Sequence, residues 1–209
     1  MLDVGANRGQ YARRLRRHGW RGPVVSFEPL PDVHAELAAA AADDPLWFVP
    51  PPLALAERDG TVLLERSAED DMSSLLPQNA TLRAISPSSR VVARVEVPVA
   101  RLENVALPDP RWRRLFLKLD VQGAEARVLE GVGRLWPRVV GVQLEMGLVP
   151  LYEGECDFAR MLAAMQARGY DLHLLIPGYF EPKLARQLQV DGVFYRREVA
   201  PAAAGAGQP

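Results

Sequence analysis

The chain has few of the features that mark membrane, secreted or nucleic-acid-binding proteins. Its 209 residues include one cysteine, which excludes an internal disulfide framework and a multi-cysteine metal site. No apolar run approaches the ~20 residues that span a bilayer, and no signal-peptide pattern opens the chain. The net charge of −1 gives no general attraction for nucleic acid. We therefore expect a cytoplasmic protein without a membrane span or a nucleic-acid partner.

The chain also offers few side chains of the kinds that bind metals or act as nucleophiles. Its three histidines, His18, His34 and His173, are scattered and have no partner at metal-ligand spacing. The one cysteine, Cys156, has no neighbouring histidine to activate it. These residues are expected to be surface or packing residues, and we predict no metal site from them.

The length favours one α/β domain with a full core rather than two independent domains. We expect this domain to cover residues 1–198. The end of the chain, residues 199–209, is rich in Ala, Gly and Pro without periodicity, so it is expected to be disordered.

The stretch Leu2-Asp3-Val4-Gly5-Ala6-Asn7-Arg8-Gly9-Gln10-Tyr11 predicts a strand, a tight glycine turn and a helix. Such a turn lets the backbone approach a ligand, because glycine has no side chain and tolerates positive φ. The alternative is an ordinary turn that needs glycine for geometry alone. The spacing lacks both the dinucleotide pattern G-x-G-x-x-G and the phosphate-binding G-K-[ST]. A ligand with a carboxylate, an amine and a ribose would fit this loop better than ATP.

The stretch Val24-Val25-Ser26-Phe27-Glu28-Pro29 predicts a short buried strand that ends in an acid, and Glu28 lies about twenty residues beyond the glycine turn. In an open parallel sheet, an acid at that place can accept hydrogen bonds from ribose hydroxyls. Glu28 could instead serve only as a charge at the start of the next helix. Further along the chain, Ala54 and Leu55 stand where a flat aromatic base could pack.

The middle of the chain predicts additional β structure. Residues 53–56 and 61–65 flank the turn Asp59-Gly60, which favours a β-hairpin at the edge of the sheet. Residues 90–99 alternate as a half-exposed strand does and are expected to pair with residues 61–65. The polar stretch 67–89 between them is expected to be a long loop, either a mobile cover over the site or disordered.

A second candidate part of the site is an apolar strand that begins at Leu115 and carries Lys118 and Asp120 at its carboxyl end. Lys118 and Asp120 are two residues apart, so their side chains project to the same side. Burying such a pair has a desolvation cost unless the charges serve each other or a ligand. An ion pair that merely fixes the strand end is the alternative.

Acids are predicted to end four strands. Because parallel strands end at one edge of a sheet, these carboxylates would converge there and describe a site. A metal bound by Asp120 and Glu145 would need an all-oxygen ligand set. The four acids are Asp3, Glu28, Asp120 and Glu145.

Four ordered motifs resemble the FkbM family of S-adenosylmethionine-dependent methyltransferases over nearly the whole chain. They are Asp3-Val4-Gly5-Ala6-Asn7-Arg8-Gly9, Phe27-Glu28-Pro29, Lys118-Leu119-Asp120-Val121-Gln122-Gly123-Ala124-Glu125, and Glu145 with Leu151-Tyr152-Glu153-Gly154. The resemblance implies a Rossmann-like class I methyltransferase fold with a mostly parallel seven-stranded sheet, an antiparallel C-terminal hairpin and an inserted β-hairpin. It also implies methyl transfer to a hydroxyl of a sugar, glycan or natural product.

The resemblance implies roles for individual residues. By position, Lys118 and Asp120 would face the methyl group and the acceptor. For the reaction itself we expect Asp120 to be the base, with Lys118 orienting it. Glu145 or Tyr152 would bind the acceptor, with Ser73 and Ser74 on the substrate side. The S-adenosylmethionine site would be formed by Asp3, Gly5, Ala6, Asn7, Gly9, Tyr11, Glu28, Pro29, Ala54, Leu55 and Asp120.

The chain departs from the family at two places. Gln122 stands where many members carry glutamate, and only Met1 and Leu2 precede Asp3 in the first strand. The alternative to an active enzyme is therefore a catalytically impaired S-adenosylmethionine-binding module that lacks its N-terminal elements. The acceptor is expected to be a small molecule or a glycan, and a homodimer is compatible with the sequence.

Overall fold

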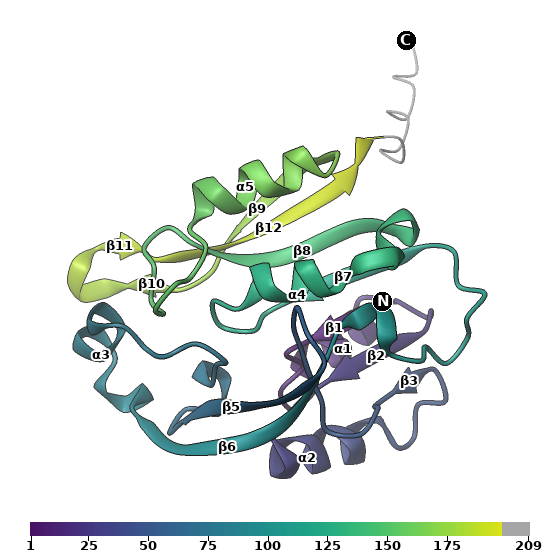
Figure 1. The fold of residues 1–209 in the computed structure, drawn as a ribbon, viewed down its shortest axis with the longest axis horizontal. Coiled ribbons are helices and arrows are strands. Elements are labelled where there is room, and N and C mark those ends of the chain that lie inside the picture. Colours follow the sequence, from purple (N-terminus) through teal and green to yellow (C-terminus); the bar gives the residue numbers. More distant parts are fainter. Residues whose placement is uncertain (198–209) are drawn as a thin grey trace.

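A mostly parallel sheet forms the centre of the molecule (Figure 1). The computed structural model describes residues 1–197, and within them the sheet has seven strands in the order β3-β2-β1-β7-β8-β12-β9. All neighbours are parallel except β12, which runs antiparallel to both β8 and β9. The α/β fold predicted from the sequence is confirmed, including its antiparallel C-terminal pair. The strands are β1 (Leu2–Val4), β2 (Val24–Phe27), β3 (Trp47–Phe48), β7 (Leu115–Leu119), β8 (Val139–Gly147), β9 (Tyr170–Pro177) and β12 (Gln189–Arg196).

Helices pack on both faces of this sheet. Neighbouring residues of β2 show this, because Val25 belongs to the same buried cluster as residues of α4 and α5, whereas Val24 packs with residues of α1 and α2. Since successive side chains of a strand point to opposite faces, the two clusters are two core layers. The helices are α1 (Gln10–Arg17), α2 (Pro31–Ala41), α4 (Glu125–Gly131) and α5 (Phe158–Ala167).

The helix ends follow local chemistry. Pro31 opens α2, where its missing N–H has no helical partner to lose. Asp157 caps α5, since its side chain accepts a hydrogen bond from the backbone N–H of Arg160 at 2.9 Å. Arginines in the last turn of α1 lie near its negative carboxyl end. Short 3-10 helices η3 (Leu102–Asn104) and η4 (Gly133–Arg138) precede β7 and β8.

A second sheet holds the inserted β structure and differs from the predicted hairpin. It has three strands in the order β4-β6-β5, formed by β4 (Ala54–Leu55), β5 (Gly60–Ser67) and β6 (Val91–Ala100). The antiparallel pairing of β5 with β6 is confirmed, but the hairpin expected between residues 53–56 and 61–65 is wrong. β4 instead runs parallel to the end of β6, and both β4 and β5 pair with Val99. Val99 is buried with Ala54 and Leu64, so apolar packing selects this arrangement over the tight turn.

The polar stretch between β5 and β6 is folded rather than an irregular loop. It contains α3 (Ala80–Ile85) between the short 3-10 helices η1 (Asp70–Met72) and η2 (Pro87–Ser89). The side chain of Asn79 caps α3 by accepting a hydrogen bond from the N–H of Leu82 at 3.0 Å. Leu82 is fully buried in a cluster with Leu151 and Tyr152, so a few apolar anchors hold this polar segment to the domain.

The C-terminal strands are joined as predicted, without a helix longer than one turn. β9 and β12 are connected through β10 (Phe180–Glu181), η5 (Pro182–Leu184) and β11 (Arg186–Gln187). The predicted domain boundary at residue 198 and the predicted disorder of residues 199–209 lie outside the described residues. None of the helices in the described part of the chain has the length and apolar character required to cross a bilayer.

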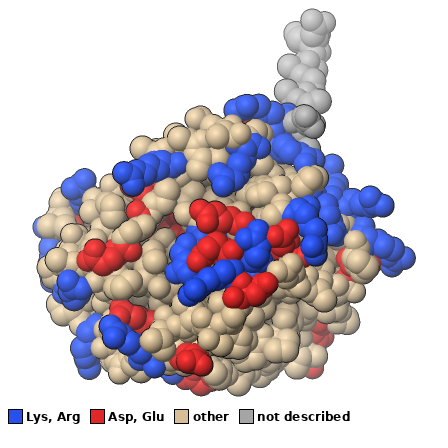
Figure 2. Space-filling model, in the orientation of Figure 1, with Lys and Arg blue, Asp and Glu red and all other residues tan. Residues whose placement is uncertain are grey.

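Positive and negative side chains are interspersed on the face that carries α4 (Figure 2). Arg127 on α4 pairs with Glu57 at 2.7 Å, and Arg101 pairs with Glu103 at 2.6 Å. Partly exposed pairs of this kind contribute little stability individually. Because of these pairs, neither sign of charge dominates this face of the molecule.

Candidate functional site

The glycine turn after β1 requires glycine at its first position. Gly5 has φ of 72°, and a Cβ built on it would lie 1.8 Å from the backbone oxygen of Asp120. The N–H groups of Gly5 and Ala6 donate to the carbonyl oxygen of Phe27 at 3.2 and 3.0 Å. The turn is therefore pressed against the ends of both neighbouring strands, β2 and β7, and no other residue type fits without moving them.

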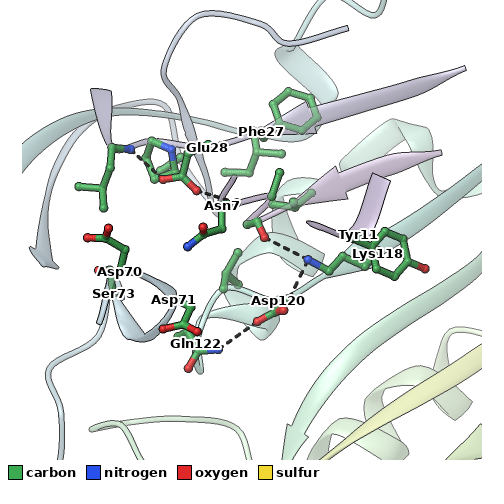
Figure 3. Close-up of a pocket in the computed structure, with 18 of the residues that line it drawn as sticks. Asn7, Tyr11, Phe27, Glu28, Asp70, Asp71, Ser73, Lys118, Asp120 and Gln122 are labelled. Atoms are coloured by element: carbon green, nitrogen blue, oxygen red, sulfur yellow. Dashed lines mark hydrogen bonds and ion pairs between the residues drawn. The ribbon is translucent and has the colours of Figure 1, made fainter. Parts of the chain in front are cut away.

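This turn forms the floor of a cavity of about 470 Å³ at the carboxyl ends of β1, β2 and β7 (Figure 3). Cavities of this size typically hold drug-sized ligands. Most residues that the sequence assigned to a site contribute to its wall. They are Gly5, Ala6, Asn7, Tyr11, Glu28, Pro29, Ala54, Leu55, Ser73, Ser74, Lys118 and Asp120.

Other residues of the cavity wall were not predicted to belong to the site. Arg14 and Arg17, which lie in the last turn of α1, put positive charge on the cavity wall. Asp70 and Asp71 belong to η1, inside the stretch expected to be a loop. Gln122 lines the cavity as well, and the departure from the family pattern was its signal.

Two acids do not stand where the sequence placed them. Asp3 lies in the middle of β1, is fully buried, and does not line the cavity, because the strand continues to Val4. Glu145 lies two residues before the end of β8. The prediction that acids end four strands therefore holds for Glu28 and Asp120, which follow β2 and β7, and is wrong for Asp3 and Glu145.

Gly9 and Tyr152 also lie away from the cavity wall. Gly9 precedes α1 with φ of 80°, and a Cβ there would lie 2.6 Å from the ring of Trp47. Tyr152 is 1% exposed, and its hydroxyl lies 3.0 Å from Oε1 of Gln122. Gly9 thus allows the turn to pack closely against Trp47. Tyr152 donates a hydrogen bond that helps to fix the side chain of Gln122.

A buried ammonium group joins the turn to two strands. Lys118 is 5% exposed, and its Nζ donates to the backbone oxygen of Gly5 at 3.0 Å. The same nitrogen lies 3.2 Å from Oδ1 of Asp3, 3.5 Å from Oδ2 of Asp120, and 5.4 Å from the centre of the Tyr11 ring. Burial alone would lower the pKa of Lys118, but the charges of Asp3 and Asp120 raise it above its usual value. The ammonium therefore stays charged.

Hydrogen bonds extend from this ion pair to the edge of the sheet. Oδ2 of Asp3 accepts from the hydroxyl of Ser26 at 3.2 Å, and that hydroxyl accepts from the indole N–H of Trp47 at 2.9 Å. The chain of contacts crosses β7, β1, β2 and β3 in order. Asp3 is thus the buried counter-ion that positions Lys118.

Glu28 faces the cavity from the end of β2. Its carboxylate accepts the N–H of Asn7 and the N–H of Leu30, both at 3.0 Å. Burial raises the pKa of Glu28 to about 7, although these two hydrogen bonds and nearby Lys118 oppose the shift. A ligand that donates hydrogen bonds to this carboxylate would favour its ionised form.

Gln122 organises the other end of the cavity. It has φ of 55°, an uncommon value for a residue other than glycine. Its side-chain N–H₂ donates to Asp120 at 3.0 Å and to Glu145 at 3.2 Å. Its backbone oxygen accepts from the hydroxyl of Ser74 at 2.6 Å. The amide therefore orients Asp120 and stands between two carboxylates.

The described residues contain no cluster of three His, Cys, Asp or Glu side chains arranged to hold a metal ion. Asp120 and Glu145 share the amide nitrogen of Gln122, which has hydrogens to donate and no free electron pair for a metal. Cys156 is half-buried, and burial raises the pKa of its thiol, so it stays protonated near neutral pH.

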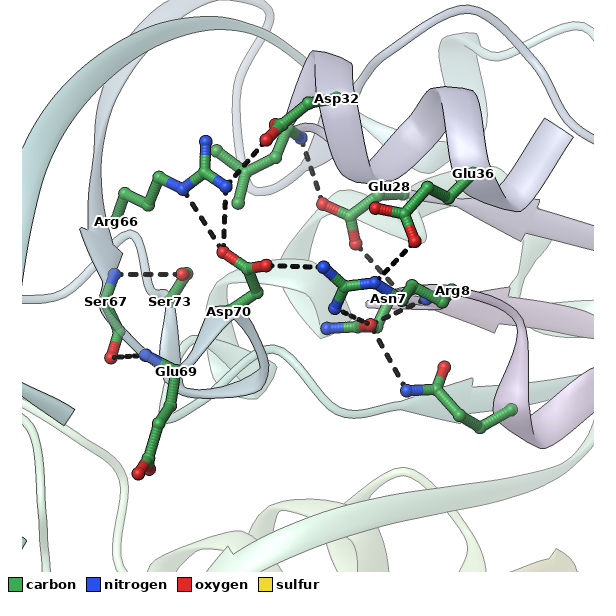
Figure 4. A network of polar contacts seen from close by, with 12 residues as sticks. Asn7, Arg8, Glu28, Asp32, Glu36, Arg66, Ser67, Glu69, Asp70 and Ser73 are labelled. Carbon is green, nitrogen blue, oxygen red and sulfur yellow. Dashed lines mark hydrogen bonds and ion pairs between the residues drawn. The ribbon is translucent and has the colours of Figure 1, made fainter. Parts of the chain in front are cut away.

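An ion-pair network holds η1 over the cavity (Figure 4). Asp70 accepts from Arg8 at 2.8 Å and from Arg66 at 3.0 Å. Arg8 also pairs with Glu36 of α2 at 2.7 Å, and Arg66 pairs with Asp32 at 2.7 Å. This network, which the sequence did not suggest, connects the glycine turn, α2 and the inserted segment.

Known proteins share the sequence pattern and the fold. Residues 3–172 match the methyltransferase FkbM domain. Methyltransferase 1 of Beauveria bassiana (strain ARSEF 2860) is 24% identical over 199 residues, which are 88% of this chain and 77% of that protein. A solved structure described as an S-adenosylmethionine-dependent methyltransferase from Listeria monocytogenes has a TM-score of 0.50 at 7% identity and covers 94% of this chain and 90% of its own. A pericyclic reaction enzyme aligns at a TM-score of 0.46 and 14% identity over 94% of this chain, which spans only 42% of that enzyme.

Replacing the buried lysine tests the importance of the ion pair for the fold. Lys118→Met removes the charge that faces Asp3, and we expect a loss of about 3–5 kcal/mol in the free energy of unfolding, because a buried carboxylate is left without its partner. Lys183→Met, at the chain's other lysine, is exposed and should change stability by less than about 0.5 kcal/mol. Urea unfolding of both variants measures the difference. Equal and small effects would contradict the role given to Lys118.

Proposed function

The chain belongs to the methyltransferase FkbM family, as its motifs indicated, and we propose that it transfers a methyl group from S-adenosylmethionine, the methyl donor of that family, to a hydroxyl oxygen. The acceptor would be a sugar, a glycan or a natural product. The observation that carries this proposal is the cavity in which the glycine turn, Glu28 and Asp120 meet.

The cavity fits the parts of the proposed donor. The turn at Gly5 brings backbone close to the space where the amino-acid end would lie, and Glu28 presents a carboxylate for the ribose hydroxyls. Ala54 and Leu55 offer buried apolar surface for the adenine ring. Arg14 of the cavity wall would attract the donor's carboxylate. Asp120 lies toward the remaining end, where the methyl group would be presented.

The reaction needs little more than positioning and removal of one proton. S-adenosylmethionine supplies a methyl group on a positively charged sulfur, so transfer forms a C–O bond, breaks the C–S bond and leaves the electron pair on sulfur. We assign removal of the acceptor's hydroxyl proton to Asp120. Lys118 and Gln122 donate toward its two oxygens and hold the carboxylate in one orientation.

The remaining residues predicted from the sequence either position another side chain or line the wall of a cavity. Asp3 positions Lys118, and Tyr152 positions Gln122. Glu145 accepts a hydrogen bond from the same amide, on the far side from the donor cavity. Ser73 and Ser74 form the part of the wall that belongs to the inserted segment.

Donor binding should depend on the turn and on the ribose carboxylate. Gly5→Val and Glu28→Ala should each weaken binding of S-adenosylmethionine by about tenfold or more, because the first displaces the turn and the second removes charge-assisted hydrogen bonds. Gly154→Val is the control, since Gly154 also has positive φ but has open space around it, away from the cavity. Calorimetry measures the three dissociation constants. Undiminished binding in both cavity variants would refute the site.

Removing the Asp120 carboxylate should affect the rate of methyl transfer more strongly than it affects binding of the donor. We expect Asp120→Asn to lower kcat by roughly 10²–10⁴ while changing the affinity for S-adenosylmethionine little, because the amide keeps its shape but cannot take a proton. Transfer of labelled methyl groups to sugars and hydroxylated lipids gives the rate. Donor binding by the wild type without transfer to any hydroxyl acceptor would favour the catalytically impaired binding module instead.

A further inference from the structure

A second cavity lies beside the first and shares part of its wall. It measures about 440 Å³, and Asp71, Asp120 and Gln122 line both cavities. A molecule in the second cavity would therefore contact the same Asp120 side chain that borders the first cavity. In-line transfer requires two ligands to be held next to each other in this way. The second cavity, called the acceptor cavity below, is lined by Glu69, Asp71, Met72, Ser86, Ser88, Asp120, Gln122, Glu145, Tyr179 and Gln189.

The acceptor cavity differs from its neighbour in charge. Four of its ten lining residues are carboxylic acids, and none of the described residues in its wall is lysine or arginine. The first cavity, in contrast, includes Lys118, Arg14 and Arg17. Apart from Met72, the rest of the acceptor wall consists of hydroxyl and amide side chains. A ligand in this cavity meets many hydrogen-bond acceptors, and the described wall has no positively charged side chain that could pair with an anion.

Glu145 is built into this wall with one oxygen left for a ligand. Its Oε2 accepts hydrogen bonds from Gln122 at 3.2 Å and from Gln189 at 2.7 Å. Among residues 1–197, no side chain or backbone group donates a hydrogen bond to its Oε1. Burial first, and then the charge of nearby Asp120, raises the pKa of Glu145 well above its usual value. A positively charged ligand would offset the repulsion between these carboxylates, and a hydroxyl-rich ligand would donate hydrogen bonds to them.

We propose that this cavity binds a polyhydroxylated acceptor that is uncharged or carries an amine, and that it rejects acceptors with a carboxylate or phosphate. The inference rests on the proposed function, since it places the acceptor next to Asp120. Hydroxyl groups of such a molecule donate to the carboxylates and amide oxygens of the wall. An anionic group would instead be placed among four acids, and that repulsion provides specificity against it.

The hydroxyl that receives the methyl group is the one that reaches Asp120. Its oxygen forms the new C–O bond, its proton passes to the Asp120 carboxylate, and the electron pair of the broken C–S bond stays on the donor sulfur. Asp71, which also lines both cavities, would meet the neighbouring hydroxyls.

Three hexosides that share a ring and differ in charge test the proposal. The probes are methyl β-D-glucosaminide, methyl β-D-glucoside and methyl β-D-glucuronide, each titrated into the full chain loaded with S-adenosylhomocysteine and followed by NMR. We expect the glucuronide to bind at least about tenfold more weakly than the glucosaminide, with the glucoside between them. Equal or tighter binding of the glucuronide would overturn the proposal.

Variants of the acceptor cavity test whether its acidic side chains cause the weaker binding of the glucuronide. Glu69→Gln combined with Asp71→Asn should reduce the preference against the glucuronide to about threefold or less, because half of the carboxylates are neutralised. Asp43→Asn, an exposed acid outside both cavities, controls for net charge and should leave the preference unchanged. Equal discrimination in the double variant and the wild type would contradict the assignment to this wall.

The loading step separates this inference from the function on which it rests. If the chain binds S-adenosylhomocysteine but none of the three hexosides, the acceptor class is wrong and the donor site stands. If S-adenosylhomocysteine itself fails to bind, the proposed function is overturned and this inference with it.

Discussion

The ammonium group of Lys118 is the contact on which the site depends. It is buried, and a buried charge is tolerated only where partners replace its water. Those partners come from three places: Asp3 inside β1, the backbone oxygen of Gly5 in the turn, and Asp120 after β7. One charge therefore fixes the relative positions of the turn and of the carboxylate to which we assign catalysis. Breaking it would disturb the fold and the chemistry together.

Unusual backbone conformations lie on both sides of that contact. Gly5 and Asn7 have positive φ in the first turn, and Gln122 and Gly123 have positive φ in the turn after β7. Glycine adopts positive φ without strain. Asn7 and Gln122 are strained in this conformation, and such residues persist where surrounding contacts hold them, which is typical of functional sites. Here the hydrogen bonds of Gln122 hold its turn and set Asp120 between the two cavities. The proposed donor and acceptor would then meet at one carboxylate.

Much of this site was predictable because its signals are local in sequence. The glycine turn, Glu28 after β2 and the pair Lys118 and Asp120 at the end of β7 each follow from the rule that ligands bind at the carboxyl ends of parallel strands. The mostly parallel sheet with its antiparallel C-terminal pair was expected from the resemblance to a known family. These elements depend on chain direction and spacing, which the sequence contains.

The remaining features depend on contacts between residues far apart in the chain. Asp70 meets Arg8 across 62 positions, and nothing in the polar stretch around it indicates that partner. The parallel pairing of β4 with β6 results from shared burial at Val99, which outweighed a favourable Asp-Gly turn. The burial of Asp3 was not predicted, because in a strand of three residues the sequence does not distinguish the middle residue from the last one. Such outcomes are decided by tertiary packing and not by local pattern.

A crystal structure of the chain with S-adenosylhomocysteine tests the central claim most directly. The account predicts the adenine against Ala54 and Leu55, the ribose hydroxyls on Glu28, and the sulfur facing Asp120 with Lys118 still bound to Asp3 and Gly5. A nucleoside bound elsewhere, or a sulfur turned away from Asp120, would contradict it.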